Sequence, residues 1–179
     1  MSAPEGLRYE EELVGGDEEA ALLGICAELR FDEIRLHGVA ARRTARHYGY
    51  GYDYERRAPA PGEPVPEWLL PLRERCAALA GAAPEELVEA LVQRYPPGAG
   101  ISWHRDAPAF GLVAGVSLAS SCRLRFRRDA GGERRSFELE LAPRSAYVLA
   151  GSARWAWQHS IPPTTALRYS VTFRTLRSG

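Results

Sequence analysis

The chain has 179 residues, of which 45% are hydrophobic and 26% charged, and its 23 basic residues balance its 23 acidic residues. This is the composition of an ordinary globular domain, and the zero net charge argues against a whole-surface attraction for nucleic acid, although local basic patches stay open. No apolar run approaches the roughly 18 residues of a membrane span, and the acidic start, MSAPEGLRYEEEL, does not resemble a secretory signal. We therefore expect one domain over 1–179, a monomer in the cytoplasm with no membrane partner.

Two helices are expected in the first half of the chain. DEEAALLGICAELR (17–30) is amphipathic with Asp17 as its N-cap, and EWLLPLRERCAALA (67–80) carries Pro71 in its first turn or at an early kink. Between them, VAARRTARHYGYGYDYERR is rich in arginine and tyrosine, and the proline-rich APAPGEPVP that follows predicts an extended loop.

From residue 91 onward, apolar and polar residues alternate with a period of two, and turn residues separate the segments. The expected strands are LVQRY, ISWHRD, VAGVSLAS, CRLRFRR, RSFELELA, SAYVLAG, RWAWQHS and RYSVTFR. The pattern predicts an α+β protein with helices first and an antiparallel jelly roll over 91–177. Arginines of CRLRFRR would face glutamates of RSFELELA across a hairpin, which favours a solvated, charge-paired face over a nucleic-acid patch.

The three cysteines, Cys26, Cys76 and Cys122, are far apart in the sequence. An odd number without a CxxC pair argues against a disulfide framework or a zinc ribbon. We expect buried free thiols in a reducing compartment.

The stretch SWHRDAP places His104 two residues before Asp106. Residues i and i+2 of a strand point to the same face, so these side chains converge, whereas Trp103 and Arg105 face the other way. With a distant histidine, for which His159 is the candidate, they would form a 2-His-1-carboxylate triad, which suits Fe(II) and leaves coordination positions open. Taken alone, H-x-D also fits a histidine that is simply hydrogen-bonded by its neighbouring carboxylate.

The C-terminal RYSVTFR would present two arginines and two hydroxyls on one face of a strand, namely Arg168, Ser170, Thr172 and Arg174. Guanidinium groups bind carboxylates in a bidentate manner, so this face could hold a small dicarboxylate. Beside an iron with open positions, such a pocket points to 2-oxoglutarate as co-substrate. The alternative is an amphipathic strand whose polar face meets solvent.

Three motifs in this order resemble the AlkB family of dioxygenases. QRYPPGAGISWHRD is similar to that family's strand, P-G turn and H-x-D, WQHSIPP to the stretch around its second metal histidine, and RYSVTFR to its R-x-N-x-T-x-R. The resemblance implies a double-stranded β-helix (jelly-roll) core, a substrate-recognition lid over about 38–66, and molecular oxygen as a second co-substrate. It assigns Fe(II) to His104, Asp106 and His159.

By position, the resemblance places Arg168, helped by Tyr95, at the distal carboxylate of 2-oxoglutarate, and Arg174 near the carboxylate at the metal end. Two residues depart from the family pattern, since Gln93 and Ser170 stand where the family has asparagines. Glutamine keeps the amide on a longer stem, and serine keeps only a hydroxyl. Co-substrate chemistry is expected to survive, and the affinity is left open.

Substrate contacts are expected in YGYGYDY, whose four tyrosines would share one face of a strand. The resemblance places this segment in the lid, where aromatic rings beside arginines fit an unstacked base and its phosphates. A tyrosine-rich strand packed on the sheet edge fits equally well. The candidate contacts are Arg46, Tyr48, Tyr50, Tyr52, Tyr54 and Trp103. Pro108 stands where some AlkB-type enzymes carry an acidic residue that contacts the damaged base, so base recognition must use other groups or be looser.

The resemblance implies an enzyme that consumes oxygen and 2-oxoglutarate at iron, forms succinate and carbon dioxide, and oxidatively dealkylates damaged bases of DNA or RNA. One alternative keeps the chemistry and changes the target, to a tRNA-modifying enzyme or a protein hydroxylase. Another is a catalytically silent binding module, against which the intact H-x-D, histidine and two-arginine set argues. The lesion, and the choice between DNA and RNA or single and double strands, are left open.

Overall fold

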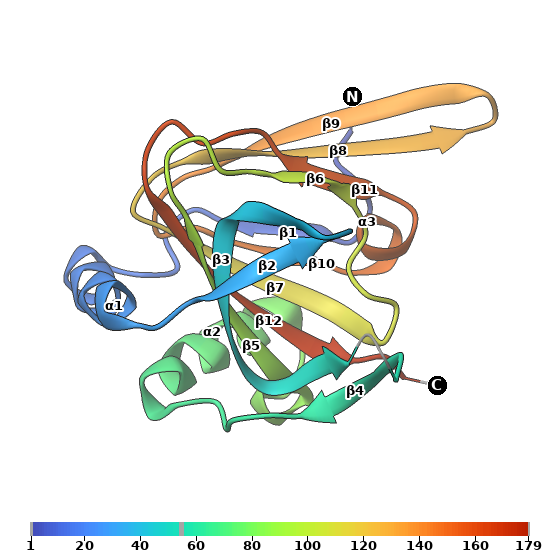
Figure 1. Ribbon diagram of the computed structural model, residues 1–179. Coiled ribbons are helices and arrows are strands. Elements are labelled where there is room, and N and C mark those ends of the chain that lie inside the picture. Colours follow the sequence, from blue (N-terminus) through green and yellow to red (C-terminus); the bar gives the residue numbers. More distant parts are fainter. Residues whose placement is uncertain (1, 54–55, 179) are drawn as a thin grey trace.

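The computed structural model describes residues 2–53 and 56–178, and in it two antiparallel β-sheets face each other with helices outside the larger one (Figure 1). This is the α+β jelly-roll architecture that the alternating pattern predicts. Within the described residues, no helix combines the length and apolar character needed to cross a membrane.

The major sheet has the strand order β1-β10-β7-β12-β5-β3-β2, with β4 paired to the far end of β3. Its central strand β12 pairs with β5 on one side and β7 on the other, so the RYSVTFR segment lies in the middle of the sheet. The strands are β1 (Leu7–Glu10), β2 (Asp32–Leu36), β3 (Val39–Asp53), β4 (Ala58–Pro61), β5 (Leu87–Tyr95), β7 (Phe110–Leu118), β10 (Ala146–Leu149) and β12 (Arg168–Leu176).

The minor sheet has the order β6-β11-β8-β9. Its strands are β6 (Ile101–His104), β8 (Cys122–Ala130), β9 (Glu133–Leu141) and β11 (Gln158–Ile161). The predicted β8–β9 hairpin is confirmed, with Arg123 opposite Glu140 and Arg125 opposite Glu138. The charge pairing is confirmed at Arg123, which forms an exposed ion pair with Glu138 at 3.5 Å.

Two hydrophobic clusters hold these layers together. One lies between the sheets and joins Val113 and Leu149 of the major sheet to Leu124 and Phe126 of the minor sheet. The other packs the outer face of the major sheet against helices α1 (Gly16–Glu28) and α2 (Leu70–Ala80). Alternate residues of each central strand therefore face either the helices or the space between the sheets, where polar side chains gather.

Of the two places expected for Pro71, the structure shows the first turn of α2, which follows a short 3₁₀ turn (Glu67–Leu69). Several other predicted boundaries need correction. Helix α1 begins at Gly16 after an N-cap at Gly15 with no side-chain cap bond, so Asp17 lies within the first turn. β5 begins at Leu87, before the predicted start. RWAWQHS is not one strand, because its first residues belong to helix α3 (Gly151–Trp155). Strands β1, β2 and β4 were not expected.

The thiol prediction is confirmed, since Cys26, Cys76 and Cys122 are all buried and free. Each lies against apolar side chains of one of the two clusters.

Gly49 marks the point at which β3 leaves the major sheet. Its φ of +74° lies in the left-handed region, and a Cβ there would come within 2.0 Å of a neighbouring backbone oxygen, so a side chain would be strained. On one side of it Tyr48 pairs with Ala90 of β5, and on the other Tyr50 pairs with β4. The two tyrosines therefore have different surroundings.

Candidate metal centre

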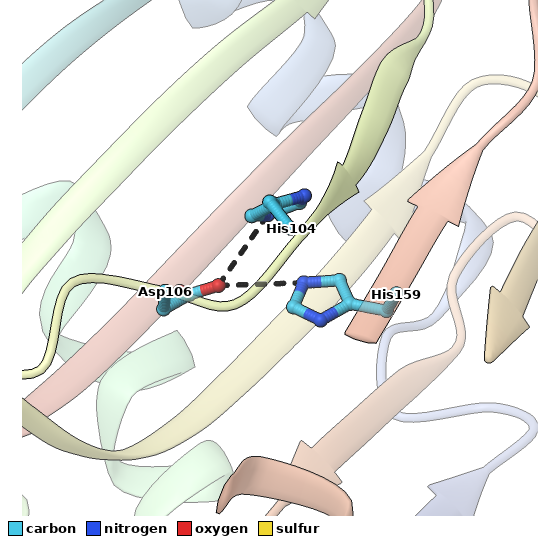
Figure 2. Close-up of side chains that lie close together, drawn as sticks. All are labelled: His104, Asp106 and His159. Atoms are coloured by element: carbon cyan, nitrogen blue, oxygen red, sulfur yellow. Dashed lines mark ion pairs between the residues drawn. The ribbon is translucent and has the colours of Figure 1, made fainter. Parts of the chain in front are cut away.

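His104, Asp106 and His159 come together at one end of the space between the sheets (Figure 2). His104 ends β6, Asp106 follows it in a loop, and His159 lies opposite His104 in β11. One oxygen of Asp106, Oδ1, is 3.5 Å from Nε2 of His104 and 3.3 Å from Nε2 of His159. One ligand atom from each residue lies within 4.8 Å of the others, so the three could hold a metal ion and leave the remaining side open.

The imidazole of His104 is oriented by its second nitrogen. Nδ1 donates to the carbonyl oxygen of Ser102 at 2.8 Å, which turns Nε2 toward Asp106 and the open side. Burial would raise the pKa of Asp106, but the two imidazoles and the charge of Arg174 hold that pKa well below its usual value. Burial lowers the pKa of His159. A negative carboxylate between two imidazoles is a donor set that suits a divalent iron.

Arg174 holds the other oxygen of this carboxylate. Its Nη1 donates to Oδ2 of Asp106 at 3.0 Å, while Nη2 donates to Oε1 of Glu89 at 2.6 Å and Nε bonds the second oxygen of Glu89. Glu89 is fully buried, so its charge depends on Arg174. The chain Glu89–Arg174–Asp106 therefore leaves Oδ1 as the oxygen available to a metal.

A buried cation without a full set of partners lies deeper in the same space. Arg168 is 1% exposed, its Nε donates to Oγ of Ser117 at 2.9 Å, and its guanidinium lies 4.9 Å from the centre of the Tyr95 ring. Among the described residues, Nη1 of Arg168 and Oγ of Ser170 are buried with no hydrogen-bond partner. Because such groups are costly unless paired, this pocket fits a carboxylate that arrives with a ligand.

Gln93 is engaged by an arginine that the motifs do not include. Its Oε1 accepts a bond of 3.2 Å from Nε of Arg43, which is 8% exposed and also donates to the Gly100 carbonyl at 3.4 Å. Burial raises the pKa of the Tyr95 hydroxyl while Arg168 and Arg43 lower it, which places both guanidinium groups near that hydroxyl. Arg43 is therefore part of the wall of the carboxylate pocket.

Arg154 shapes the loop that carries Asp106. It is 3% exposed, and its Nη2 donates to the carbonyl oxygens of Ala107 at 3.0 Å and Phe110 at 2.7 Å, while Nε donates to that of Gly111 at 2.7 Å. A buried arginine thus spans the two ends of the turn that follows the carboxylate.

The structure separates the predicted substrate residues. Tyr48 is 7% exposed within the cluster under the helices, so its ring is not available to a substrate. Arg46, on the same face, lies over the Tyr48 ring and forms a 2.6 Å ion pair with Glu63. Tyr50 is 39% exposed, and the side chain of Tyr52 and the whole of Tyr54 lie outside the described residues. The four tyrosines therefore do not form one face that is open to a substrate, because Tyr48 is buried in the core.

The opposite face of β3 is the one that points between the sheets. Its alternate residues include Arg43, Ala45 and His47, of which Ala45 pairs with Gln93 and His47 with Leu91 of β5. Loss of hydration and the charge of Arg174 lower the pKa of His47, which places this imidazole near the metal end. The polar residues at odd-numbered positions of this segment are the sequence signal for the inward face, although the tyrosines at even-numbered positions are the more conspicuous pattern.

Trp103 lies on the opposite face of β6 from His104, as predicted, and lines a groove of about 450 Å³. Two arginines of β8 contact its ring, with the guanidinium carbon of Arg125 at 5.1 Å from the ring centre and that of Arg127 at 4.5 Å. The other wall is the turn between β2 and β3, including exposed Leu36 and Val39. This Trp103 groove thus joins apolar surface to a cluster of arginines.

A jelly roll with two histidines and one carboxylate beside a buried, incompletely paired arginine has the parts of a non-haem iron oxygenase. A family model described as the 2OG-Fe(II) oxygenase superfamily matches residues 28–174. The chain therefore belongs to the 2OG-Fe(II) oxygenase superfamily. Members of this superfamily are dioxygenases that use Fe(II), 2-oxoglutarate and molecular oxygen.

Among curated proteins, the chain is 33% identical over 147 residues to the Alkylated DNA repair protein ALKBH8 homolog of Arabidopsis thaliana, across 68% of this chain and 42% of that protein. It is 28% identical over 99 residues to Uncharacterized protein L905 of Acanthamoeba polyphaga mimivirus, across 48% of this chain and 47% of that protein. The chain thus spans less than half the length of these relatives.

Among solved structures, OsALKBH1 aligns with a TM-score of 0.71 at 15% identity over 98% of each chain. A Pseudomonas putida prolyl-4-hydroxylase aligns with a TM-score of 0.63 at 19% identity, over 97% of this chain and 94% of that one. At these identities the likeness supports the jelly-roll fold.

Proposed function

We propose that this chain oxidatively removes N-alkyl or etheno adducts from bases of DNA or RNA. The observation that carries the proposal is the Trp103 groove, where an aromatic ring and arginines lie along the strand that ends in His104. Aromatic faces stack on bases, and guanidinium groups neutralise phosphates. The name of the Arabidopsis relative, an alkylated DNA repair protein homolog, supports the same substrate class.

In this proposal His104, Asp106 and His159 bind Fe(II), and the 2-oxoglutarate pocket lies beside them. The distal carboxylate meets Nη1 of Arg168, whose position in the pocket is maintained by Ser117 and the Tyr95 ring. Ser170 supplies a hydroxyl to the same pocket, and Gln93 acts through Arg43. When bound, iron, 2-oxoglutarate and molecular oxygen would supply the oxidation, in which one oxygen atom enters succinate as carbon dioxide is lost and the other hydroxylates the alkyl group.

The remaining residues position these groups. Arg174 holds Oδ2 of Asp106 so that Oδ1 faces the metal, and Ser102 keeps the proton of His104 on Nδ1. We assign the lid to residues 38–66, with its β2–β3 turn as one wall of the Trp103 groove. An N-alkyl group that is hydroxylated at the carbon attached to nitrogen falls apart to an aldehyde and the unmodified base, so the protein needs no general base for release.

The test is incubation with Fe(II), 2-oxoglutarate and oligonucleotides that carry methylated or etheno-bridged bases, in both DNA and RNA. Mass spectrometry should find restored bases in step with succinate, and the His104→Ala variant should give neither. Succinate formation that depends on a tRNA or a peptide, with no base restored in any oligonucleotide, would instead favour a tRNA-modifying enzyme or a protein hydroxylase. The absence of both succinate and restored bases would favour a silent binding module.

A further inference from the structure

A second groove, also of about 450 Å³, is lined by residues of α3, by the start of β7 and by the end of β12. Its centre is Trp155, the last residue of α3, whose ring is 41% exposed. The guanidinium carbon of Arg154 lies 4.1 Å from the ring centre and that of Arg177 lies 4.8 Å from it. Trp155 thus resembles Trp103 in having two arginine side chains close to its ring.

This Trp155 groove is positively charged. The described residues that line it include Arg154 and Arg177 and no aspartate or glutamate. Arg154 is buried and its bonds go to backbone carbonyls, whereas Arg177 is exposed. In a chain of zero net charge, this local excess creates a site for an anion, and Arg177 is the member free to meet one.

The Trp155 groove is tied directly to the metal loop. The backbone N–H of Arg177 donates to the carbonyl of Ala109 at 2.9 Å, three residues beyond Asp106. Leu176, on the same wall, is 37% exposed, so the groove also offers apolar surface. A ligand in this groove would lie beside the loop whose other side faces the metal.

Arg105 connects the Trp155 groove to the Trp103 groove. It lies two residues after Trp103, and its Nη2 donates to the carbonyl of Ala156, the neighbour of Trp155, at 3.3 Å. From the far side, Nη1 of Arg128 donates to Oγ of Ser152 in α3 at 3.5 Å. Both hydrogen bonds are accepted by uncharged oxygens, so these contacts do not neutralise the charges of Arg105 and Arg128. A band of arginine and tryptophan therefore runs from one groove past the metal loop to the other.

We propose that the Trp155 groove is a second nucleic-acid contact, so that the substrate is a single strand several nucleotides long rather than a free nucleotide or nucleoside. This inference rests on the proposed function and adds the length of the substrate. Trp155 stacks on a base beyond the target nucleotide, and Arg177 pairs with an adjacent phosphate. The Trp103 groove receives the other side of the strand.

The experiment compares Arg177→Ala, Trp155→Ala and Trp155→Phe with the wild type, each loaded with Mn(II) and 2-oxoglutarate so that no turnover occurs. Fluorescence anisotropy measures binding of a labelled single-stranded oligonucleotide of about 15 nucleotides as a function of salt. Arg30→Ala is the matched control, because it removes one exposed arginine from the segment between α1 and β2, at the opposite end of the molecule from α3 (Figure 1).

Arg177→Ala and Trp155→Ala should each weaken binding about tenfold, and Trp155→Phe should restore most of the loss, since every base stacks on an aromatic face. Arg177→Ala should also reduce the slope of log affinity against log salt by about 0.7, the value for one contact to a single strand. Arg30→Ala should bind as the wild type does.

Binding by both alanine variants equal to that of Arg30→Ala would overturn the inference, as would no detectable binding by the wild type. Equal kcat/KM of the iron-loaded wild type for an alkylated nucleoside and for the same lesion in the oligonucleotide would also overturn it. If the wild type restores bases and the variants bind the oligonucleotide as strongly as the wild type does, the second contact alone is refuted. Weakened variant binding without any base restored by the wild type would refute the proposed dealkylation and leave the groove as a strand-binding surface.

Discussion

Arg174 donates from Nη1 to Oδ2 of Asp106 across 3.0 Å, while Oδ1 of the same carboxylate faces the Nε2 atoms of His104 and His159 at 3.5 and 3.3 Å. Oδ2 is thus bound by Arg174, whereas Oδ1 is left to face the two histidines. A carboxylate fixed in this way can offer a metal one oxygen in a defined direction, which is the usual function of the groups around metal ligands.

Replacing one of the three clustered ligands should abolish metal binding. In His104→Ala, two ligands remain, and we expect Fe(II) affinity to fall by at least about 100-fold, beyond the loss typical of groups that only orient a ligand. Anaerobic titration with Fe(II) and 2-oxoglutarate, followed by visible absorption, measures this. His37→Asn is the control, because His37 has a left-handed φ of 50° that asparagine tolerates. Equal affinity in the two variants would contradict the assignment.

Glu89→Leu should destabilise the protein strongly. It leaves Arg174 buried with one of its two carboxylate partners gone, and losing one member of a buried ion pair costs about 3–5 kcal/mol. Urea unfolding of the metal-free protein measures the change. The control is Glu63→Leu, which removes the 63% exposed side chain paired with Arg46, and should cost no more than about 1 kcal/mol. A similar small cost at both positions would show that the buried pair contributes little.

Arg168→Met should raise the KM for 2-oxoglutarate about 100-fold, because a distal carboxylate would lose its buried charged partner. Succinate formation at varied 2-oxoglutarate measures it. Arg94→Met is the control, since Arg94 is on the same strand pair and pairs with Tyr169, whose side chain packs under the helices. An unchanged KM in Arg168→Met would remove Arg168 from the co-substrate site.

Stability should fall as the pH rises above about 9. Burial raises the pKa of the Cys26 thiol to about 11 and that of the Cys76 thiol to about 12, from an ordinary value of 9.0. Between the ordinary and the raised values, the unfolded chain loses the thiol protons while the folded chain keeps them, so deprotonation favours unfolding. Urea midpoints of the metal-free protein from pH 8 to pH 11 measure this. A flat profile in that range would contradict the buried, protonated state of the two thiols.

Replacement of the two neighbouring tyrosines of β3 by alanine should change the unfolding free energy by different amounts. Tyr48→Ala should cost about 3–5 kcal/mol, as for a large aromatic removed from a core. Tyr50→Ala removes a ring that is 39% exposed and should change the unfolding free energy by less than about 1 kcal/mol. Thermal unfolding of both variants checks the difference. Equal costs would mean that Gly49 does not separate the two environments.

Much of the candidate site follows from local pattern. His104 and Asp106 are two residues apart, and Arg168 to Arg174 alternate on one strand, so strand geometry alone predicts which of them share a face. The structure confirms the second grouping, with Tyr169, Val171 and Phe173 packed under the helices. It also brings His104 and Asp106 together, but β6 ends at His104 and Asp106 lies in the loop that follows, so the strand expected over ISWHRD is too long. The β8–β9 hairpin is predictable for the same reason, since its turn and its alternation are both local.

The sequence by itself predicted the jelly-roll class, the grouping of His104, Asp106 and His159, and the strand that carries two arginines, because each depends on spacing of two residues or on motif order. Only the tertiary structure decided that Glu89 neutralises Arg174, that Arg43 engages Gln93, and that Arg154 spans the loop after Asp106. These contacts join residues far apart in the sequence, and strand pairing sets them. Tyr48 shows the same limit, since its alternation predicts a face, and only the neighbouring layer decides whether that face meets substrate or core.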